Sequence, residues 1–199
     1  MSLPAEGQTA VVADLHDLVK SGTRFGTIYA DPPWAYSNQA TRAATDNHYE
    51  TLTVDELCDA AKFPVDALAA EDAHLHLWTT NAFLFDARLI IEAWGFTYKS
   101  CFVWVKTEMG IGNYWRVSHE FMLLGVRGSC PFLDKSLMSW AEHHRTRHSA
   151  KPHQVRRSVE KASPQPRLEL FARNACDGWV VWGDEIQRDL FISSVRDST

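Results

Sequence analysis

The sequence contains no long hydrophobic run and little excess charge of either sign. No stretch approaches the roughly twenty consecutive apolar residues of a membrane-spanning helix, and no basic and apolar leader opens the chain. We therefore expect a cytoplasmic protein without a membrane partner. The net charge of −5 argues against a histone-like coat for nucleic acid, although it leaves room for a local basic face.

Paired cysteines and a dinucleotide-binding fingerprint are also missing. The four cysteines, which we expect to be buried free thiols in a reducing compartment, are Cys58, Cys101, Cys130 and Cys176. Three histidines lie between positions 143 and 148, but no cysteine or acid accompanies them at ligand spacing, so we assign no metal site. The Gly-x-Gly at 110–112 lacks the third glycine and the helix that a dinucleotide site requires.

The composition is that of a globular protein, with 45% hydrophobic and 12% aromatic residues among 199. This length suits one α/β domain and is short for two. We expect a flexible N-terminus over residues 1–10, one domain over 11–190 and a tail over 191–199. No internal repeat or low-complexity segment appears.

Periodicity and turn residues predict alternating strands and helices. A helix begins at Thr53, with Glu56 as its capping-box partner, and another runs from about Asn81 to Trp94 before Gly95 stops it. A third begins near Lys151. The predicted strands cover 27–30, 74–78, 97–106, the apolar run after Glu120, 167–173 and 178–186. This alternation predicts an α/β fold with a mostly parallel central sheet flanked by helices.

The most specific feature is the stretch 27–34, in which a short apolar strand ends in Asp31-Pro32-Pro33-Trp34. The prolines stop the strand, so Asp31 and an exposed Trp34 are expected at its carboxyl end, where open α/β sheets bind ligands. A carboxylate and a proline carbonyl can accept hydrogen bonds from an exocyclic amine while an aromatic ring stacks on the base. Asp-Pro-Pro also occurs in ordinary turns, so this motif alone leaves both interpretations open.

Asp-Pro-Pro-Trp is the signature of amino methyltransferases acting on adenine N6, and the chain resembles the MT-A70 family. The second half of the family pattern is present as Lys151-Pro152 before a helix, Glu-Leu-Phe-Ala-Arg at 169–173 and Trp-x-x-Trp-Gly at 179–183. The resemblance covers about residues 14–186. It implies a Rossmann-like methyltransferase domain that uses S-adenosyl-L-methionine, with a permuted order in which the catalytic motif precedes the donor-binding strand.

The resemblance also implies roles in donor binding. Lys151 would hold the donor carboxylate, and Asp31 would face its ammonium group. The remaining candidates are Asp14 with Leu15 at the donor's adenine (Asp17 with Leu18 competes for this role), Arg173 and Asn174 at ribose and adenine, and Asp184 and Glu185 at the ribose hydroxyls. Ala175 departs from the messenger-RNA enzyme, which has a histidine there.

Two polar stretches, 35–50 and 129–150, are long for simple connections and suit substrate contacts. The first ends in Tyr49-x-Thr, whose tyrosine in the family lies beside the donor and the target base. The resemblance implies that Trp34, Trp104, Lys106, Arg116, His119 and Glu120 line the substrate cleft, and Arg145 and Arg147 of the second stretch suit contacts with backbone phosphates. From 143 to 173, eight lysines and arginines oppose two glutamates, which indicates either a solvated helix face or a phosphate-contacting surface.

The function predicted from the sequence is transfer of a methyl group from S-adenosyl-L-methionine to adenine N6 in DNA, as in bacterial and phage methylases. Compactness and the absence of RNA-binding appendages favour DNA over RNA as the nucleic-acid partner. RNA remains the first alternative, and a catalytically silent partner subunit the second, although such subunits typically lose the acid or the prolines. Cytosine N4 methylation uses the same amine chemistry, but the relatives that perform it usually begin the motif with Ser. Family analogy suggests a homodimer or a heterodimer with a paralogue.

Overall fold

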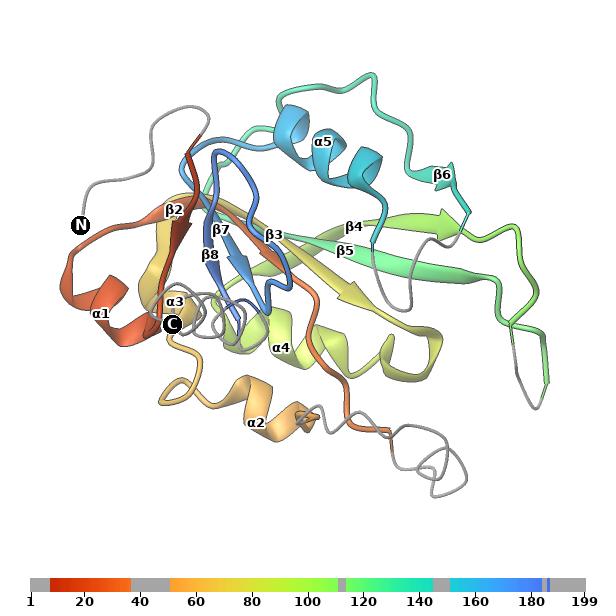
Figure 1. The fold of residues 1–199 in the computed structure, drawn as a ribbon, viewed down its shortest axis with the longest axis horizontal. Coiled ribbons are helices and arrows are strands. Elements are labelled where there is room, and N and C mark those ends of the chain that lie inside the picture. The colour runs from red at the N-terminus through yellow and green to blue at the C-terminus, as the bar shows by residue number, and fades with distance from the viewer. Residues whose placement is uncertain (1–7, 37–50, 111–113, 145–150, 184–185, 187–199) are drawn as a thin grey trace, which may run out of the picture.

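An eight-stranded sheet lies at the centre of the computed structural model, which describes residues 8–36, 51–110, 114–144, 151–183 and 186 (Figure 1). The strand order is β1-β8-β7-β2-β3-β5-β4-β6, and within it only β5 runs against its neighbours. The strands are β1 (Ala10–Val11), β2 (Phe25–Ala30), β3 (Ala69–Thr79), β4 (Thr97–Val105), β5 (His119–Arg127), β6 (Trp140–Glu142), β7 (Arg167–Leu170) and β8 (Val180–Trp182). The predicted mostly parallel sheet is confirmed.

Helices cover both faces of this sheet. Helix α5 lies over one face, and α2 and α4 lie under the other (Figure 1). The helices are α1 (Leu15–Lys20), α2 (Val54–Cys58), α3 (Val65–Leu68), α4 (Ala87–Ala93) and α5 (His153–Ala162), with a 3₁₀ turn at Asn81–Phe83. Within the described ranges, none of them is long and apolar enough to cross a membrane.

Two hydrophobic cores result, one on each side of the sheet. The core beneath α1 to α4 is mainly aliphatic, whereas the core beneath α5 contains Tyr29, Trp78, Trp104 and Trp179. Since strand β2 lies between them, all six of its residues are buried. Burial on both faces is the usual condition of a central parallel strand, and it fixes the backbone that leads into Asp31.

Several local signals in the sequence act as expected. The hydroxyl of Thr53 accepts a hydrogen bond from the Glu56 amide, and the Glu56 carboxylate accepts one from the Thr53 amide, so the capping box begins α2. Gly95 has φ of +82°, and a Cβ there would lie 2.2 Å from Asp66 Oδ1. Only glycine fits both conditions, which explains why the chain leaves α4 at this point.

The helix predicted from Asn81 to Trp94 is wrong in its first half. Residues 81–83 form the 3₁₀ turn, and the α-helix begins only at Ala87. The hydroxyl of Thr80, which precedes the turn, makes no cap because it pairs with the Tyr36 hydroxyl at 2.9 Å. Strand β7 is also shorter than predicted, since Phe171 adopts φ of +61° and turns the chain after Leu170.

Two histidines of β3 are buried beside the end of α5. His74 Nδ1 and His76 Nε2 each lie 2.8 Å from Ser163 Oγ, and His74 Nε2 lies 3.2 Å from the Cys130 carbonyl oxygen. The carbonyl can only accept, so His74 Nε2 donates to Cys130. Burial lowers the pKa of both histidines, that of His76 to about 3, and so favours neutral rings. With a neutral His74, Nδ1 accepts from the Ser163 hydroxyl, which in turn accepts from His76.

We expect these histidines to make the fold sensitive to acid. Both histidines have pKa values below the usual 6.5 in the folded protein, so the unfolded chain binds their protons more tightly. The free energy of unfolding is therefore highest above pH 6.5 and decreases as the pH falls towards 3. Each contributes a slope of at most about 1.4 kcal/mol per pH unit. Urea unfolding of His76→Gln at pH 7, 6 and 5 should show a shallower loss than the parent protein. Equal slopes would contradict the neutral, buried state of His76.

Candidate active site

The Asp-Pro-Pro-Trp motif directly follows β2 and is fixed by backbone hydrogen bonds. Trp34 N donates to the Pro32 carbonyl at 3.0 Å, and Leu52 N donates to the Pro33 carbonyl at 2.7 Å. Trp34 and Leu52 also form a parallel bridge. The prediction that the prolines end the strand is confirmed, and one lone pair of the Pro32 carbonyl oxygen remains beside Asp31 for a ligand.

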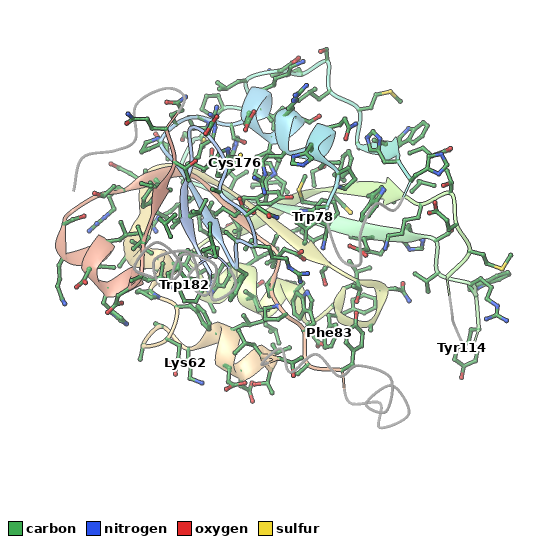
Figure 2. The ribbon with its side chains drawn as sticks, viewed as in Figure 1. Lys62, Trp78, Phe83, Tyr114, Cys176 and Trp182 are labelled. Atoms are coloured by element: carbon green, nitrogen blue, oxygen red, sulfur yellow. The ribbon has the colours of Figure 1, made fainter. Side chains whose placement is uncertain are left out.

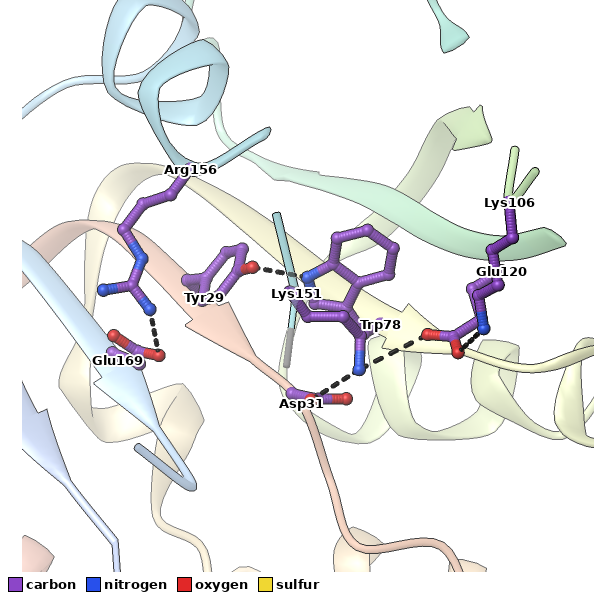
Figure 3. Close-up of polar contacts among 8 residues, drawn as sticks. All are labelled: Tyr29, Asp31, Trp78, Lys106, Glu120, Lys151, Arg156 and Glu169. Atoms are coloured by element: carbon purple, nitrogen blue, oxygen red, sulfur yellow. Dashed lines mark hydrogen bonds and ion pairs between the residues drawn. The ribbon is translucent and has the colours of Figure 1, made fainter. Parts of the chain in front are cut away.

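Asp31 belongs to a row of alternating charges that crosses the sheet (Figure 3). Lys151 Nζ, just before α5, lies 2.6 Å from Asp31 Oδ2 and 3.3 Å from Glu120 Oε2. The other oxygen of Glu120 pairs with Lys106 at the end of β4. Burial alone would raise the pKa of Glu120, but Lys151 and Lys106 outweigh it and lower that pKa. The four side chains are less than a quarter exposed, so these charges interact strongly.

A further acid, Glu169 on β7, is buried and pairs with Arg156 of α5 at 2.6 Å (Figure 3). Its second oxygen, Oε2, is buried and has no hydrogen-bond partner among the described residues. Burial raises the pKa of Glu169 to about 7 despite the opposing effect of Arg156. The sequence analysis placed this residue in a predicted strand and in the family pattern but gave it no role in the site. An acid between two leucines of a buried strand was the signal that could have identified it.

Trp34 is not the exposed ring that the sequence predicted. It is 6% exposed, because its ring stacks on Phe83 at 4.8 Å between centroids. Its indole Nε1 is buried without a partner within the part of the chain that the structure describes. The exposed aromatic residue here is Tyr36, which packs edge-on against Phe83 and is 48% exposed. The stacked rings of Trp34 and Phe83 therefore lie next to the motif that contains Asp31.

The predicted donor contacts after β1 and β7 have varied local environments. Asp14 caps α1 by accepting a hydrogen bond from His16 N at 2.8 Å, and Leu15 is buried in the aliphatic core. Arg173 is partly buried and Asn174 exposed, both in the connection that follows β7. These positions follow carboxyl ends of parallel strands, and their roles toward a donor stay predictions.

The structure describes some of the candidates for substrate contacts and not others. Lys106 and Glu120 belong to the charge row, and His119 packs edge-on against Phe121 at 4.8 Å. Arg116 is exposed near the end of the β4–β5 hairpin, whose Tyr114 lies far from Trp78 (Figure 2). The candidates that lie outside the described residues are Tyr49, Arg145, Arg147, Asp184 and Glu185.

The basic cluster at 143–173 is partly structural. Arg156 and Arg167 lie over the ring of Trp179 at 5.8 and 5.9 Å, and Arg167 also donates to the Glu160 carbonyl oxygen. These two side chains face the core, so neither interpretation of the cluster as a surface applies to them. Arg157 and Lys161 are exposed on α5 and remain available for phosphate contacts.

The residues present fit the amino-acid end of S-adenosylmethionine. That group carries a carboxylate and an ammonium, and the site offers Lys151 for the first and Asp31 for the second. Lys151 and Asp31 also pair with each other, so both charges are held in place and partly removed from water.

Comparisons with known proteins show the family to which the chain belongs. The MT-A70 family model matches residues 25–185. The type II methyltransferase M.MunI of a Mycoplasma species is 32% identical over 182 residues, which cover 82% of this chain and 78% of that protein. A probable N(6)-adenosine-methyltransferase MT-A70-like of Oryza sativa is 31% identical over 177 residues, covering 82% of this chain and 23% of that protein.

The catalytic subunit METTL3 of the human N(6)-adenosine-methyltransferase is 29% identical over 178 residues, covering 82% of this chain and 28% of that protein. The chain thus spans about a quarter of the two eukaryotic relatives and most of the Mycoplasma one. The matched segment contains the Asp-Pro-Pro-Trp motif, the charge row and the strands that position them. The chain therefore belongs to the MT-A70 family and is an adenine N6-methyltransferase that uses S-adenosyl-L-methionine.

Proposed function

We propose that this enzyme methylates adenine N6 in DNA. The observation that carries the proposal is the similarity to a type II methyltransferase along 78% of its length. Type II methyltransferases are linked to restriction systems, whose substrate is DNA. The similarity to adenosine methyltransferases covers about a quarter of those proteins and favours RNA as the alternative substrate.

We propose that Asp31 and the Pro32 carbonyl accept the two amino hydrogens of the target adenine. These hydrogen bonds would increase electron density on N6 and direct its lone pair away from the two acceptors. Bound S-adenosylmethionine would supply an electrophilic methyl group on its sulfonium. No strong base is required, because the proton can leave after the new bond has formed.

Lys151 would bind the donor carboxylate while Asp31 turns to the donor ammonium. The pair of opposite charges that lie 2.6 Å apart in the structure would thus be exchanged for two pairs with the donor. Glu120 supports this exchange, since its contact with Lys151 at 3.3 Å keeps the ammonium in place from the other side. Lys106 in turn holds Glu120.

The target base must leave a duplex or be unpaired before it reaches Asp31, at a cost of a few kcal/mol for unstacking. The stacked Trp34 and Phe83 would form a fixed wall for this base, and Tyr36 would be the accessible ring beside it. Exposed Arg157 and Lys161 on α5 are candidates for contacts with the phosphate backbone.

The test is transfer of labelled methyl from S-adenosylmethionine to matched oligonucleotides of single-stranded DNA, duplex DNA and RNA. We expect label in DNA, recovered after digestion as N6-methyladenine. Label only in RNA would overturn the choice of substrate, and labelled N4-methylcytosine would overturn the choice of base. A folded protein that binds the donor but labels none of them would support a silent subunit instead.

We also propose that the enzyme pairs with itself or with a paralogue through the β4–β5 hairpin. Near the end of that hairpin, Met109, Tyr114 and Trp115 are each more than three-quarters exposed. Exposed aromatic side chains that gather at one place commonly mark an interface. Sedimentation velocity should show a dimer that Trp115→Ser weakens, and a monomer at all concentrations would exclude the homodimer.

A further inference from the structure

We propose that Trp78, held in place by Tyr29, is a positioning residue that aims the ammonium group of Lys151 at the donor. The inference rests on the proposed assignment of Lys151 to the donor carboxylate. It adds to that assignment an uncharged partner on the neighbouring strand β3, which keeps the lysine in position without neutralising it.

The contact between the lysine and the ring is direct. Lys151 Nζ lies 5.2 Å from the centre of the Trp78 ring, within the range of a cation–π interaction (Figure 3). The Lys151 side chain is 11% exposed and Trp78 is 1% exposed. Because little water competes at such a site, the attraction is stronger than between exposed partners.

The ring itself cannot turn away from the lysine. Its Nε1 donates a hydrogen bond to the Tyr29 hydroxyl at 2.6 Å, and its edges pack against Phe102 and Trp104 at 6.5 and 6.2 Å. Tyr29 is held in turn by an edge contact with Trp179 at 5.9 Å. Trp78 is thus part of a packed aromatic core rather than a mobile side chain at the rim of the site.

An uncharged support solves a specific problem at this position. Lys151 lies outside α5, and its long side chain has several rotatable bonds, so it needs contacts that fix it. Asp31 and Glu120 provide such contacts, but each also neutralises the charge that a donor carboxylate must find. The face of Trp78 attracts the ammonium, carries no net charge and remains in place when Asp31 turns to the donor.

The test compares donor affinity in variants of the full chain by isothermal titration calorimetry with S-adenosylmethionine. Trp78→Leu should weaken binding about tenfold, because the aromatic face is lost. Trp78→Phe keeps a ring under the ammonium and should remain within about threefold of the parent. Tyr29→Phe keeps the volume but removes the hydrogen bond that orients the indole. It should weaken binding a few-fold even if Trp78→Leu fails to fold.

Trp94→Leu is the matched control. Trp94 is also 1% exposed and donates its Nε1 hydrogen to the Leu57 carbonyl at 2.8 Å, but it lies in the core on the other side of the sheet. Its loss should lower the unfolding temperature without changing the affinity of the folded protein. Equal weakening by Trp94→Leu and Trp78→Leu would reduce the role of Trp78 to general packing and overturn the proposal.

Lys151→Met separates this inference from the assignment on which it rests. If Lys151→Met weakens donor binding and both Trp78→Leu and Tyr29→Phe bind as the parent does, Lys151 binds the donor without help from Trp78, and the inference fails alone. If Lys151→Met itself binds normally, the donor carboxylate lies elsewhere and both fail. We expect strong weakening in Lys151→Met and Trp78→Leu, a weakening of no more than a few-fold in Tyr29→Phe and Trp78→Phe, which both lose the hydrogen bond but keep a ring at position 78, and parent-like binding in Trp94→Leu.

Discussion

Replacing Asp31 by Asn is expected to lower the rate of methyl transfer about a thousandfold while the protein stays folded. The substitution keeps the shape of the side chain but removes the charge that would orient the target amine and face the donor ammonium. Lys151 keeps a partner in Glu120 at 3.3 Å, so no buried charge is left alone. The loss should therefore lie in the chemical step and not in stability.

Single-turnover transfer of labelled methyl to a DNA oligonucleotide measures this effect, with circular dichroism to confirm the fold. The matched control is Asp134→Asn, the same chemical change at a partly exposed loop residue whose carboxylate accepts hydrogen bonds from the amide and hydroxyl of Ser136. It should transfer at the parent rate. Near-normal transfer by a folded Asp31→Asn variant would show that the amine is oriented by other groups, and the proposed mechanism would be wrong.

The parts of the fold that could be predicted are those set by neighbouring residues. The capping box at Thr53, the stop at Gly95 and the strand end at Pro32 each depend on a local backbone requirement that the sequence states directly. The helix predicted from Asn81 begins only at Ala87, and the hydroxyl of Thr80, which the sequence offered as a cap, pairs instead with Tyr36, 44 residues before it in the chain. Contacts of that kind depend on the tertiary structure and leave no periodic signal.

In the candidate site, too, the sequence predicted the residues but not the contacts between distant parts of the chain. The motif identified Asp31, and the family resemblance identified Lys151, but their contact joins residues 120 positions apart. Nothing in the spacing of the chain indicates that the two charges meet. The burial of Trp34 depends likewise on Phe83, which arrives from the end of β3. The sequence therefore named the chemistry of the site, whereas the order of the charges came from the structure.

Glu169 is a residue whose burial the sequence did indicate, although it was counted among the charges of a surface. A glutamate that follows Leu168 in a strand buried on both sides cannot be an ordinary surface charge. Its pairing with Arg156 also removes that arginine from the basic surface inferred from composition. Counting charges along the chain overstates a surface whenever two of the charges neutralise each other in the core.

Replacing Lys151 by Met is expected to weaken S-adenosylmethionine binding about a hundredfold and to destabilise the ligand-free protein by about 2 kcal/mol at pH 8. The first effect follows from loss of the charge proposed to bind the donor carboxylate. The second arises because Asp31 and Glu120, each no more than 20% exposed, then face each other with no cation between them. Lys151→Arg keeps the charge and should retain most of the stability.

The destabilisation should depend on pH with a defined sign. Lys151 is one of the two lysines that lower the pKa of Glu120 against the effect of burial, so its removal raises that pKa and favours protonation. The difference in unfolding free energy between Lys151→Met and the parent should therefore shrink as the pH falls from 8 to 5. Urea unfolding across that range, with calorimetric titration of the donor at pH 8, measures both effects. A difference independent of pH would mean that the two acids do not interact through Lys151, and parent-like donor affinity would move the donor carboxylate to another residue.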